Sequence, residues 1–321
     1  MKCPNCNKEV LPEWKTCPFC EFKPKLCSDP NCKSGWLPQQ AHFCPKCGSP
    51  VKGEEGLNLK ESIAAVVAVK AKDGSSVGNK PEKGRLSFVI DDVSFDMIKV
   101  EAGTFYMGDS EYDGNPIHEV ELTHDYYIGE TQVTQALWEA VGCQNNSTFE
   151  DDDNPVENVS WEDCQKFINK LNQKLRKQIE PLGMKFRLPT EAEWEFAARG
   201  GNESGSYDYA GSDDLDEAAW YDGNSDGETH NVAEKKPNEL GIYDMTGNVW
   251  EWCQDWYGSD YYYKSPAKDP IGPSSGSSRV LRGGSWSRDA EYCRVAYRDY
   301  YGPGARSSYI GFRLALVHQK G

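Results

Sequence analysis

Residues 279–316 read RVLRGGSWSRDAEYCRVAYRDYYGPGARSSYIGFRLAL, and two kinds of residue alternate in this stretch. RVLRGGSW, CRVA and IGFRLAL combine apolar residues with glycine, which predicts buried strands. Between them lies a set rich in Tyr, Ser, Gly and Asp, as in the binding surfaces of antibodies. Its members are Ser287, Arg288, Asp289, Tyr292, Tyr297, Asp299, Tyr300, Tyr301, Gly302, Gly304, Ala305, Ser307, Ser308 and Tyr309. The stretch therefore predicts a rigid framework that presents a variable binding surface at residues 287–309.

Length and charge set limits on what the rest of the chain does. With 321 residues, the chain is long enough for one large domain and a small module. The net charge of −16 opposes binding to phosphate backbones, so nucleic acid is an unexpected partner. We find no apolar run of the roughly 18 residues that span a bilayer, and no signal-peptide core. We therefore expect a cytoplasmic protein without membrane attachment.

Eight of the 12 cysteines precede residue 48, and their spacing predicts metal binding. Two knuckles of two cysteines each, CPNC with CPFC and the widened CSDPNC with CPKC, form each tetrahedral four-thiolate site, which is the structural zinc type. The ligands are Cys3, Cys6, Cys17 and Cys20 for one Zn²⁺, and Cys27, Cys32, Cys44 and Cys47 for the other. A module of this size has little core, so zinc would supply much of its folding free energy. A disulfide-rich module is the alternative. Disulfides are typical of exported proteins, and we find no export signal.

This first module, residues 1–50, resembles the double zinc ribbon family, whose members bind proteins or nucleic acids. Its few Lys and Arg residues favour docking to another protein. Residues 51–92 follow as a linker rich in Gly, Ser, Lys and Glu. The linker holds one apolar island at residues 63–69, which could dock as a strand or a helix on either domain.

Three helix starts are predicted within residues 93–318. Thr134, Ser160 and Thr190 stand where N-caps belong, before QALWEAV, WEDCQKFINKL and EAEWEFAARGG. Asp163 and Glu193 complete capping boxes at the second and third of these starts. The remaining sequence contains short strands and many Gly, Asn and aromatic residues. These features predict an α+β domain with long ordered loops.

Several phrases of this domain resemble the formylglycine-generating-enzyme (sulfatase-modifying factor) family. They are AGTFYMGD, ETQVTQALWEAV, PVENVSWEDC, FRLPTEAEWEFAARGG, ELGIYDMTGNVWEWCQDWY, RVLRGGSW and IGFRLAL, in the order typical of the family. The resemblance implies a variant of the C-type lectin fold. The family includes oxidases and binding proteins, so the fold does not decide the function.

The resemblance also implies where an oxidase would keep its catalytic residues. Formylglycine-generating enzymes bind copper(I) through two cysteines after the RGGS strand, and these positions correspond to Arg288 and Cys293 here. Arginine cannot ligate copper, so we expect no enzyme activity and interpret Cys293 as a buried thiol in a CRVA strand. The iron-dependent relatives use a His-rich helical domain, whereas this chain has five His. A copper or iron oxidase remains the alternative function.

A structural Ca²⁺ site is implied by the same resemblance. Its ligands would be the carboxylates of Asp244 and Glu251 and the carbonyl oxygens of Gly247 and Val249. Hard oxygen ligands from one tight loop suit this ion. The alternative is that the GNVWEW motif only locks the core around a turn.

Residues 279–316 also resemble the variable region of variable proteins that are diversified by retroelements. All candidate positions hold residues that an Asn codon reaches when its first two bases change, and none is Lys, Gln, Glu, Met or Trp. The expected function is therefore binding of a ligand, most simply a protein, by an exchangeable surface. A zinc-ribbon adaptor with an inert C-terminal domain is a further alternative. A diversified surface is not tied to one ligand, and the sequence determines neither the ligand nor the oligomeric state.

Overall fold

The computed structural model describes residues 26–27, 51–52, 84–109 and 116–319. The chain divides into two units, Met1–Ser75 and Ser76–Gly321. In the first unit, β1 (Leu26–Cys27) pairs with β2 (Val51–Lys52) in an antiparallel ladder. The predicted linker therefore begins too early, because its first residues belong to a strand. The predicted zinc ligands other than Cys27 lie outside the described residues, as does the apolar island at 63–69; for Cys27, only the backbone is described.

A five-stranded sheet with the order β3-β4-β7-β13-β8 forms one half of the second unit. Its strands are β3 (Arg85–Ile90), β4 (Val93–Val100), β7 (Tyr126–Gly129), β8 (Met184–Arg187) and β13 (Ala315–His318), and all their pairings are antiparallel. The predicted linker ended at residue 92, but β3 already belongs to this sheet. The domain therefore starts earlier than its apolar pattern suggested.

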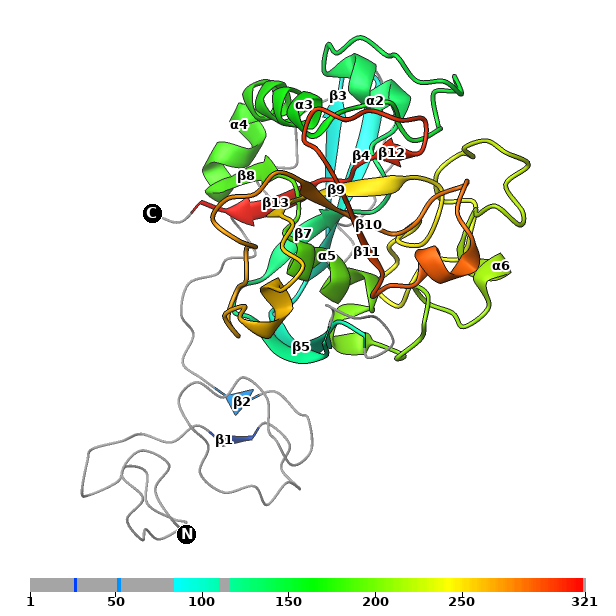
Figure 1. The fold of residues 1–321 in the computed structure, drawn as a ribbon. Helices are drawn as coiled ribbons and strands as arrows, with labels where there is room; N and C mark the ends of the chain where they lie inside the picture. The colour runs from blue at the N-terminus through cyan, green and yellow to red at the C-terminus, as the bar shows by residue number, and fades with distance from the viewer. Residues whose placement is uncertain (1–25, 28–50, 53–83, 110–115, 320–321) are drawn as a thin grey trace, which may run out of the picture. The chain divides into compact units, whose positions relative to one another are not determined.

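The second sheet contains strands from residues 279–316. Its order is β11-β10-β9-β12, and its strands are β9 (Trp250–Trp256), β10 (Arg279–Arg282), β11 (Arg298–Tyr301) and β12 (Ile310–Gly311). β10 pairs antiparallel with both β9 and β11, whereas β12 runs parallel to β9. A separate hairpin joins β5 (Gly103–Met107) to β6 (His118–Leu122). Figure 1 shows β11 and the loops beside it in orange and red.

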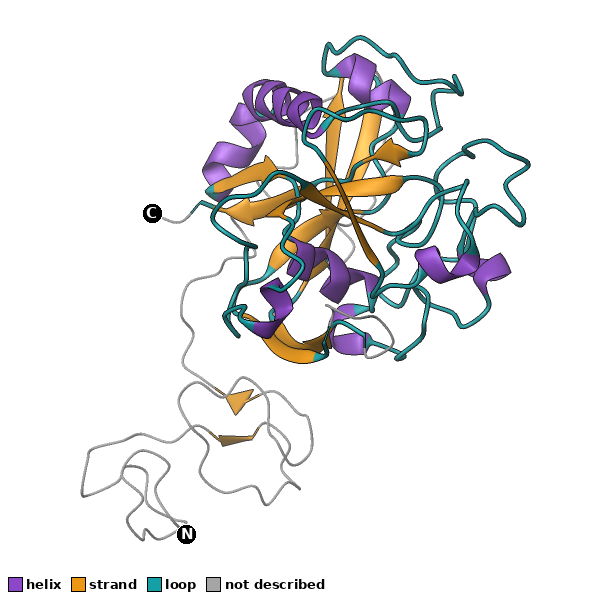
Figure 2. Cartoon of the chain, in the orientation of Figure 1, coloured by secondary structure: helices purple, strands orange, loops and turns teal. Residues whose placement is uncertain are grey.

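The three predicted helix starts are confirmed. Thr134 caps α2 (Gln135–Ala140), Ser160 caps α3 (Trp161–Lys174), and Thr190 caps α5 (Glu191–Ala198). The last two starts are complete capping boxes, with Asp163 and Glu193 returning a bond to the cap backbone. Shorter helical pieces are α4 (Arg176–Ile179), α6 (Leu215–Ala218), η1 (Glu180–Leu182), η2 (Gly201–Glu203), η3 (Tyr261–Tyr263) and η4 (Ala290–Cys293). Much of the domain is loop, as Figure 2 shows.

Two predicted strands of the C-terminal stretch are wrong in detail. CRVA forms no strand, because Cys293 ends η4 and the following residues run on as loop; the strand is RDYY, which pairs with β10. IGFRLAL is split into β12 and β13, because its two ends belong to different sheets. Phe312 and Leu314, between them, are buried.

The core fills the space around both sheets. Trp194, Trp250 and Trp252 are among its largest fully buried side chains, and Phe167 and Phe312 pack in the same interior. No helix in the part of the chain that the structure describes is long and apolar enough to cross a membrane.

Candidate binding surface

The candidate positions at 287–309 all reach the surface. Asp289, Tyr300 and Gly304 are exposed, and the other candidate positions are half-buried. Among the residues between them, Cys293, Val295, Ala296 and Arg298 are buried, whereas Glu291 and Arg306 are exposed. Buried and accessible residues thus alternate along this segment, and the accessible ones include residues outside the candidate set.

Buried ion pairs hold the framework under this surface. Arg282 of β10 contacts Glu191 at 3.0 Å and Glu195 at 2.6 Å, with both of its partners on α5. Arg298 of β11 donates to both carboxylate oxygens of Glu191, each at 2.7 Å. Such bidentate pairs fix geometry as well as charge. β10 and β11 are thereby anchored to the same helix.

Two glycines turn the chain from β10 into the display segment. Gly283 and Gly284 have φ angles of 98° and 75°, which favour glycine. A Cβ on Gly284 would lie 2.5 Å from the Sγ of Cys293. The turn is therefore pressed against the buried thiol.

Aromatic side chains dominate the surface itself. The rings of Tyr292 and Tyr297 lie 4.9 Å apart, and the hydroxyls of Tyr301 and Tyr309 lie 3.2 Å apart. The hydrogen bond from Tyr301 and the charge of Arg288 lower the pKa of Tyr309, whereas the same hydrogen bond raises the pKa of Tyr301. The tyrosines sit half-buried at the edge of the core, so they are ordered before any ligand binds.

Two surface aromatic residues were missed by the sequence analysis. Tyr257 follows β9 and stacks on Tyr300 with ring centroids 4.0 Å apart. Trp286 is half-buried and donates from Nε1 to the carbonyl of Ser308. Trp286 lies within residues 279–316, so the sequence offered its position as a signal. Tyr257 lies outside this range, and the pairing of β9 with β10 brings it to the surface.

The thiol of Cys293 lies in the interior of the domain. Its side chain is fully buried, and burial raises the pKa of the thiol to about 12. A thiolate, the form that binds copper, is disfavoured in such surroundings. The structure places Arg288 half-buried on the same segment.

The positions predicted to bind calcium do converge on one point. The carbonyl oxygens of Asp244, Gly247 and Val249 and the Oε1 of Glu251 lie 3.0–3.4 Å from one atom. That atom is the side-chain nitrogen of Gln132. Asp244 differs from the prediction, because its carboxylate accepts the N–H of Ala233 and only its carbonyl faces the cage.

In this structure the amide of Gln132 occupies the place of a cation. Gln132 fills the cage with an N–H donor, and its own Oε1 is buried without a partner among the described residues. Glu251 is already neutralised by Arg313, which contacts it at 2.6 and 2.7 Å. Trp194 donates to the same carboxylate at 2.6 Å. A Ca²⁺ ion would have to displace the amide and share Glu251 with a guanidinium.

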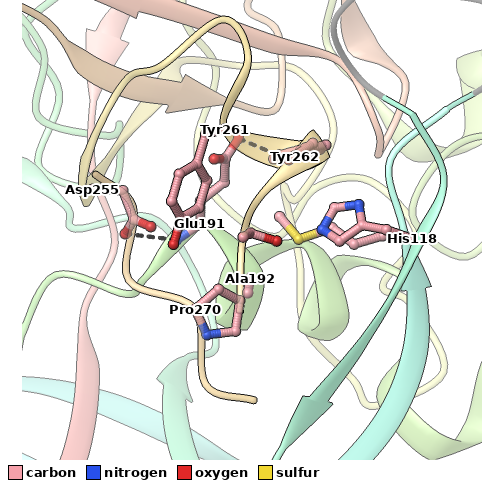
Figure 3. Close-up of a pocket in the computed structure, with 9 residues that line it drawn as sticks. His118, Glu191, Ala192, Asp255, Tyr261, Tyr262 and Pro270 are labelled. Atoms are coloured by element: carbon pink, nitrogen blue, oxygen red, sulfur yellow. Dashed lines mark hydrogen bonds between the residues drawn. The ribbon is translucent and has the colours of Figure 1, made fainter. Parts of the chain in front are cut away.

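The small cavity beside α5 is no ligand site. It has a volume of ≈ 10 Å³ and is lined by His118, Glu191, Asp255 and Tyr262, among others (Figure 3). This volume admits about one water molecule. The Nε2 of His118 and the Oγ of Ser265, two of the residues that line the cavity, are buried without a partner in the described part of the chain. The cavity therefore belongs to the buried polar network.

Residues 92–317 match the model of the Sulfatase-modifying factor enzyme 1-like domain. The chain belongs to this family. Among solved structures, this family member is similar to Treponema denticola variable protein 1, with 39% identity and a TM-score of 0.66, over 72% of this chain and 98% of that one. The predicted α+β fold of C-type-lectin type is thereby confirmed.

Other relatives of this family member carry different names. The formylglycine-generating enzyme of Streptomyces coelicolor is 39% identical over 178 residues, which cover 50% of this chain and 52% of the enzyme. The chaperone protein LppX of Paenibacillus barcinonensis is 30% identical over 250 residues, which cover 64% of this chain and 83% of the relative. The chain thus spans about half the length of the Streptomyces enzyme, and membership of the family alone leaves enzyme and binding protein open.

Proposed function

We propose that this chain is a variable ligand-binding protein, which displays residues 287–309 on a rigid lectin-like framework and takes another protein as its ligand. The exposure pattern is the observation that supports this proposal best. No candidate position is buried, whereas Cys293, Val295, Ala296 and Arg298 between them are. Side chains on such a surface can change without cost to the core. The similarity to the Treponema variable protein over nearly all of that chain supports the same function.

The proposal includes that the chain is not an oxidase. Arg288 stands where the family resemblance implies the first catalytic cysteine, and a guanidinium does not ligate copper(I). Cys293 alone cannot form a two-thiolate site, and its burial disfavours the thiolate. The identity to the Streptomyces enzyme is the observation that favours the alternative.

A pair of libraries tests the binding function. One library randomises the fourteen candidate positions with codons for Tyr, Ser, Gly, Asp and Asn, and its control randomises Cys293, Val295, Ala296 and Ile310. We expect most members of the first library to resist proteolysis as the parent does, and most members of the control to be degraded. Selections from the first library on different protein targets should yield different binders. Degradation of most members of the first library would contradict the proposal.

An oxygen-consumption assay tests the alternative. The full chain is incubated with copper(I) and a cysteine-containing sulfatase peptide, beside a formylglycine-generating enzyme as positive control. We expect oxygen consumption at the level of the peptide alone. Turnover that disappears in a Cys293→Ser variant would establish an oxidase.

We further propose that the N-terminal cysteines bind two structural Zn²⁺ ions and that this module docks another protein. The regular spacing of the cysteine pairs supports the metal, and the small number of basic residues supports a protein partner. Metal analysis of the unchelated full chain should find about two zinc ions per chain. Far fewer would contradict this assignment.

A further inference from the structure

Arg288 is set apart from the other arginines of the domain. Its guanidinium makes no hydrogen bond or ion pair within the described residues, whereas every other arginine in that part of the chain has such a partner. Its Nε is buried and unpaired, while its two terminal nitrogens are absent from the buried unpaired atoms and so keep access to solvent. An arginine held in this way has donors left for a ligand.

Aromatic rings hold this guanidinium in position. Its central carbon lies 5.6 Å from the ring centroid of Tyr292 and 5.5 Å from that of Tyr309. Both distances are within the range of cation–π attraction. The backbone is fixed as well, because the N–H of Arg288 donates to Ser285 and its carbonyl accepts from Asp222. The cation therefore loses little freedom when a ligand arrives.

The same chain shows what a guanidinium of this kind takes as its partner. Arg298 binds both oxygens of Glu191, and Arg313 binds both oxygens of Glu251. The planar fork matches a carboxylate in two parallel bonds. A half-buried cation without a partner is costly, and an incoming carboxylate removes that cost.

We propose that Arg288 is the charged anchor of the display surface and receives a carboxylate side chain, Asp or Glu, of a protein ligand. This inference rests on the proposed binding function. Tyr292 and Tyr309 flank the ion pair, and the hydroxyls of Tyr301 and Tyr309 line its edge. The negative charge of Asp299 favours the protonated form of these two hydroxyls. Asp289 is the exposed neighbour of Arg288. These two negative charges disfavour a doubly charged phosphate more than a single carboxylate.

A peptide selection tests the anchor. A random linear peptide library is panned on the full chain, and each selected peptide is remade with Gln or Asn in place of its Glu or Asp. Binding of each pair is then measured on wild type, Arg288→Gln, Arg288→Lys and Arg306→Gln. Arg306 is the matched control, because it lies on the same segment but is already paired with Asp163 at 2.6 Å.

We expect selected peptides to share one acidic position. Its conversion to the amide should weaken binding to wild type by about tenfold or more, the size of one charged hydrogen-bond pair. The discrimination should vanish in Arg288→Gln, shrink in Arg288→Lys, which keeps the charge but loses the fork, and persist in Arg306→Gln. Unchanged melting temperatures would establish that the variants are folded, and Arg288→Lys serves if Arg288→Gln is not.

Other outcomes separate the failure of this inference from that of the proposed function. Peptides that bind wild type but not a Tyr297→Ala, Tyr300→Ala double variant, yet show no acidic preference, overturn the anchor and leave the binding surface intact. An acidic preference that survives in Arg288→Gln overturns it too. Tighter binding of phosphoserine at the acidic position overturns the assignment of a carboxylate. Peptides that ignore the surface tyrosines contradict both proposals.

Discussion

At the scale of single residues, a few side chains decide what this member of the family can bind. Gln132 places an N–H donor where the resemblance implied a calcium ion. Arg288 stands where the resemblance implies a copper-binding cysteine, and its guanidinium has no acceptor among the described residues. Gly284 exists as glycine because Cys293 leaves no room for a Cβ. Each of these residues acts through contacts with residues that do not adjoin it in the sequence.

The amide in the oxygen cage leads to a prediction about calcium. We expect the melting temperature of the full chain to be the same in EGTA and in excess Ca²⁺, because the side chain of Gln132 already occupies the cage. Gln132→Glu should place a second carboxylate beside Glu251 and lose about 3–5 kcal/mol of stability in EGTA. Ca²⁺ should restore part of that loss. Thermal unfolding with and without calcium measures both, and a wild type stabilised by calcium would contradict the prediction.

Two glycines of the display segment should respond differently to alanine. Gly284→Ala is expected to cost about 2–4 kcal/mol, since it adds strain at a positive φ and a clash with Cys293. Gly302→Ala is the matched control, because a Cβ there meets nothing within 4 Å. Its stability should stay within about 0.5 kcal/mol of wild type. Denaturant unfolding compares them, and equal losses would show that the framework is assigned wrongly.

At the scale of elements, β11 joins framework and display in one strand. Arg298 faces inward to Glu191, whereas Tyr300, two residues later, is 48% exposed and stacks on Tyr257. The strand is anchored at its start by charge and extends from the core to the surface over a few residues. Tyr257 lies between Arg298 and Tyr300, since the guanidinium carbon of Arg298 is 4.9 Å from the centroid of its ring.

This division predicts unequal effects along β11. Arg298→Ala should cost about 3–5 kcal/mol, because it leaves the buried Glu191 with one partner fewer. Tyr300→Ala should cost no more than about 1.5 kcal/mol, the range of one aromatic pair. Unfolding in urea measures both variants. A Tyr300 variant as unstable as the Arg298 variant would mean that the tyrosine belongs to the core.

At the scale of the whole molecule, buried carboxylates gather around the start of α5. Asp255 accepts the backbone N–H of Glu191 at 3.0 Å, and burial followed by the charge of Glu191 raises its pKa to about 8 (Figure 3). Glu193 raises this pKa further, and Arg187 opposes the shift. The folded protein thus keeps a proton that the unfolded chain releases near its ordinary pKa of about 4.

This proton makes stability depend on pH. Between about pH 4 and pH 8 the folded state binds more protons, so stability falls as pH rises, by up to about 1.4 kcal/mol per unit, and levels off above pH 8. Asp255→Asn keeps an oxygen for Glu191 and removes the titration. We expect the variant to gain on wild type steadily from pH 5 to pH 8 in urea unfolding. A constant difference across this range would contradict the raised pKa.

How much of this protein follows from sequence alone can be judged element by element. The starts of α2, α3 and α5 were predicted correctly, because a cap and its capping box involve residues only three positions apart. The family and the fold followed from ordered motifs, and the display positions remain a prediction. CRVA was misassigned, since the strand is chosen by pairing with β10 and not by local alternation.

The tertiary structure alone decided the contents of the sites. No sequence pattern around Gln132 predicts that its amide contacts oxygens of residues 244–251, which lie more than a hundred positions away. Likewise, Arg288 looks like any loop arginine until every other arginine is seen to have a partner. Local chemistry sets caps, turns and the alternation of apolar residues, whereas the satisfaction of a buried polar group depends on everything packed around it. The sequence by itself therefore determined the family, the fold class and three helix starts, and the packed fold decided which guanidinium between residues 287 and 309 has no partner among the described residues.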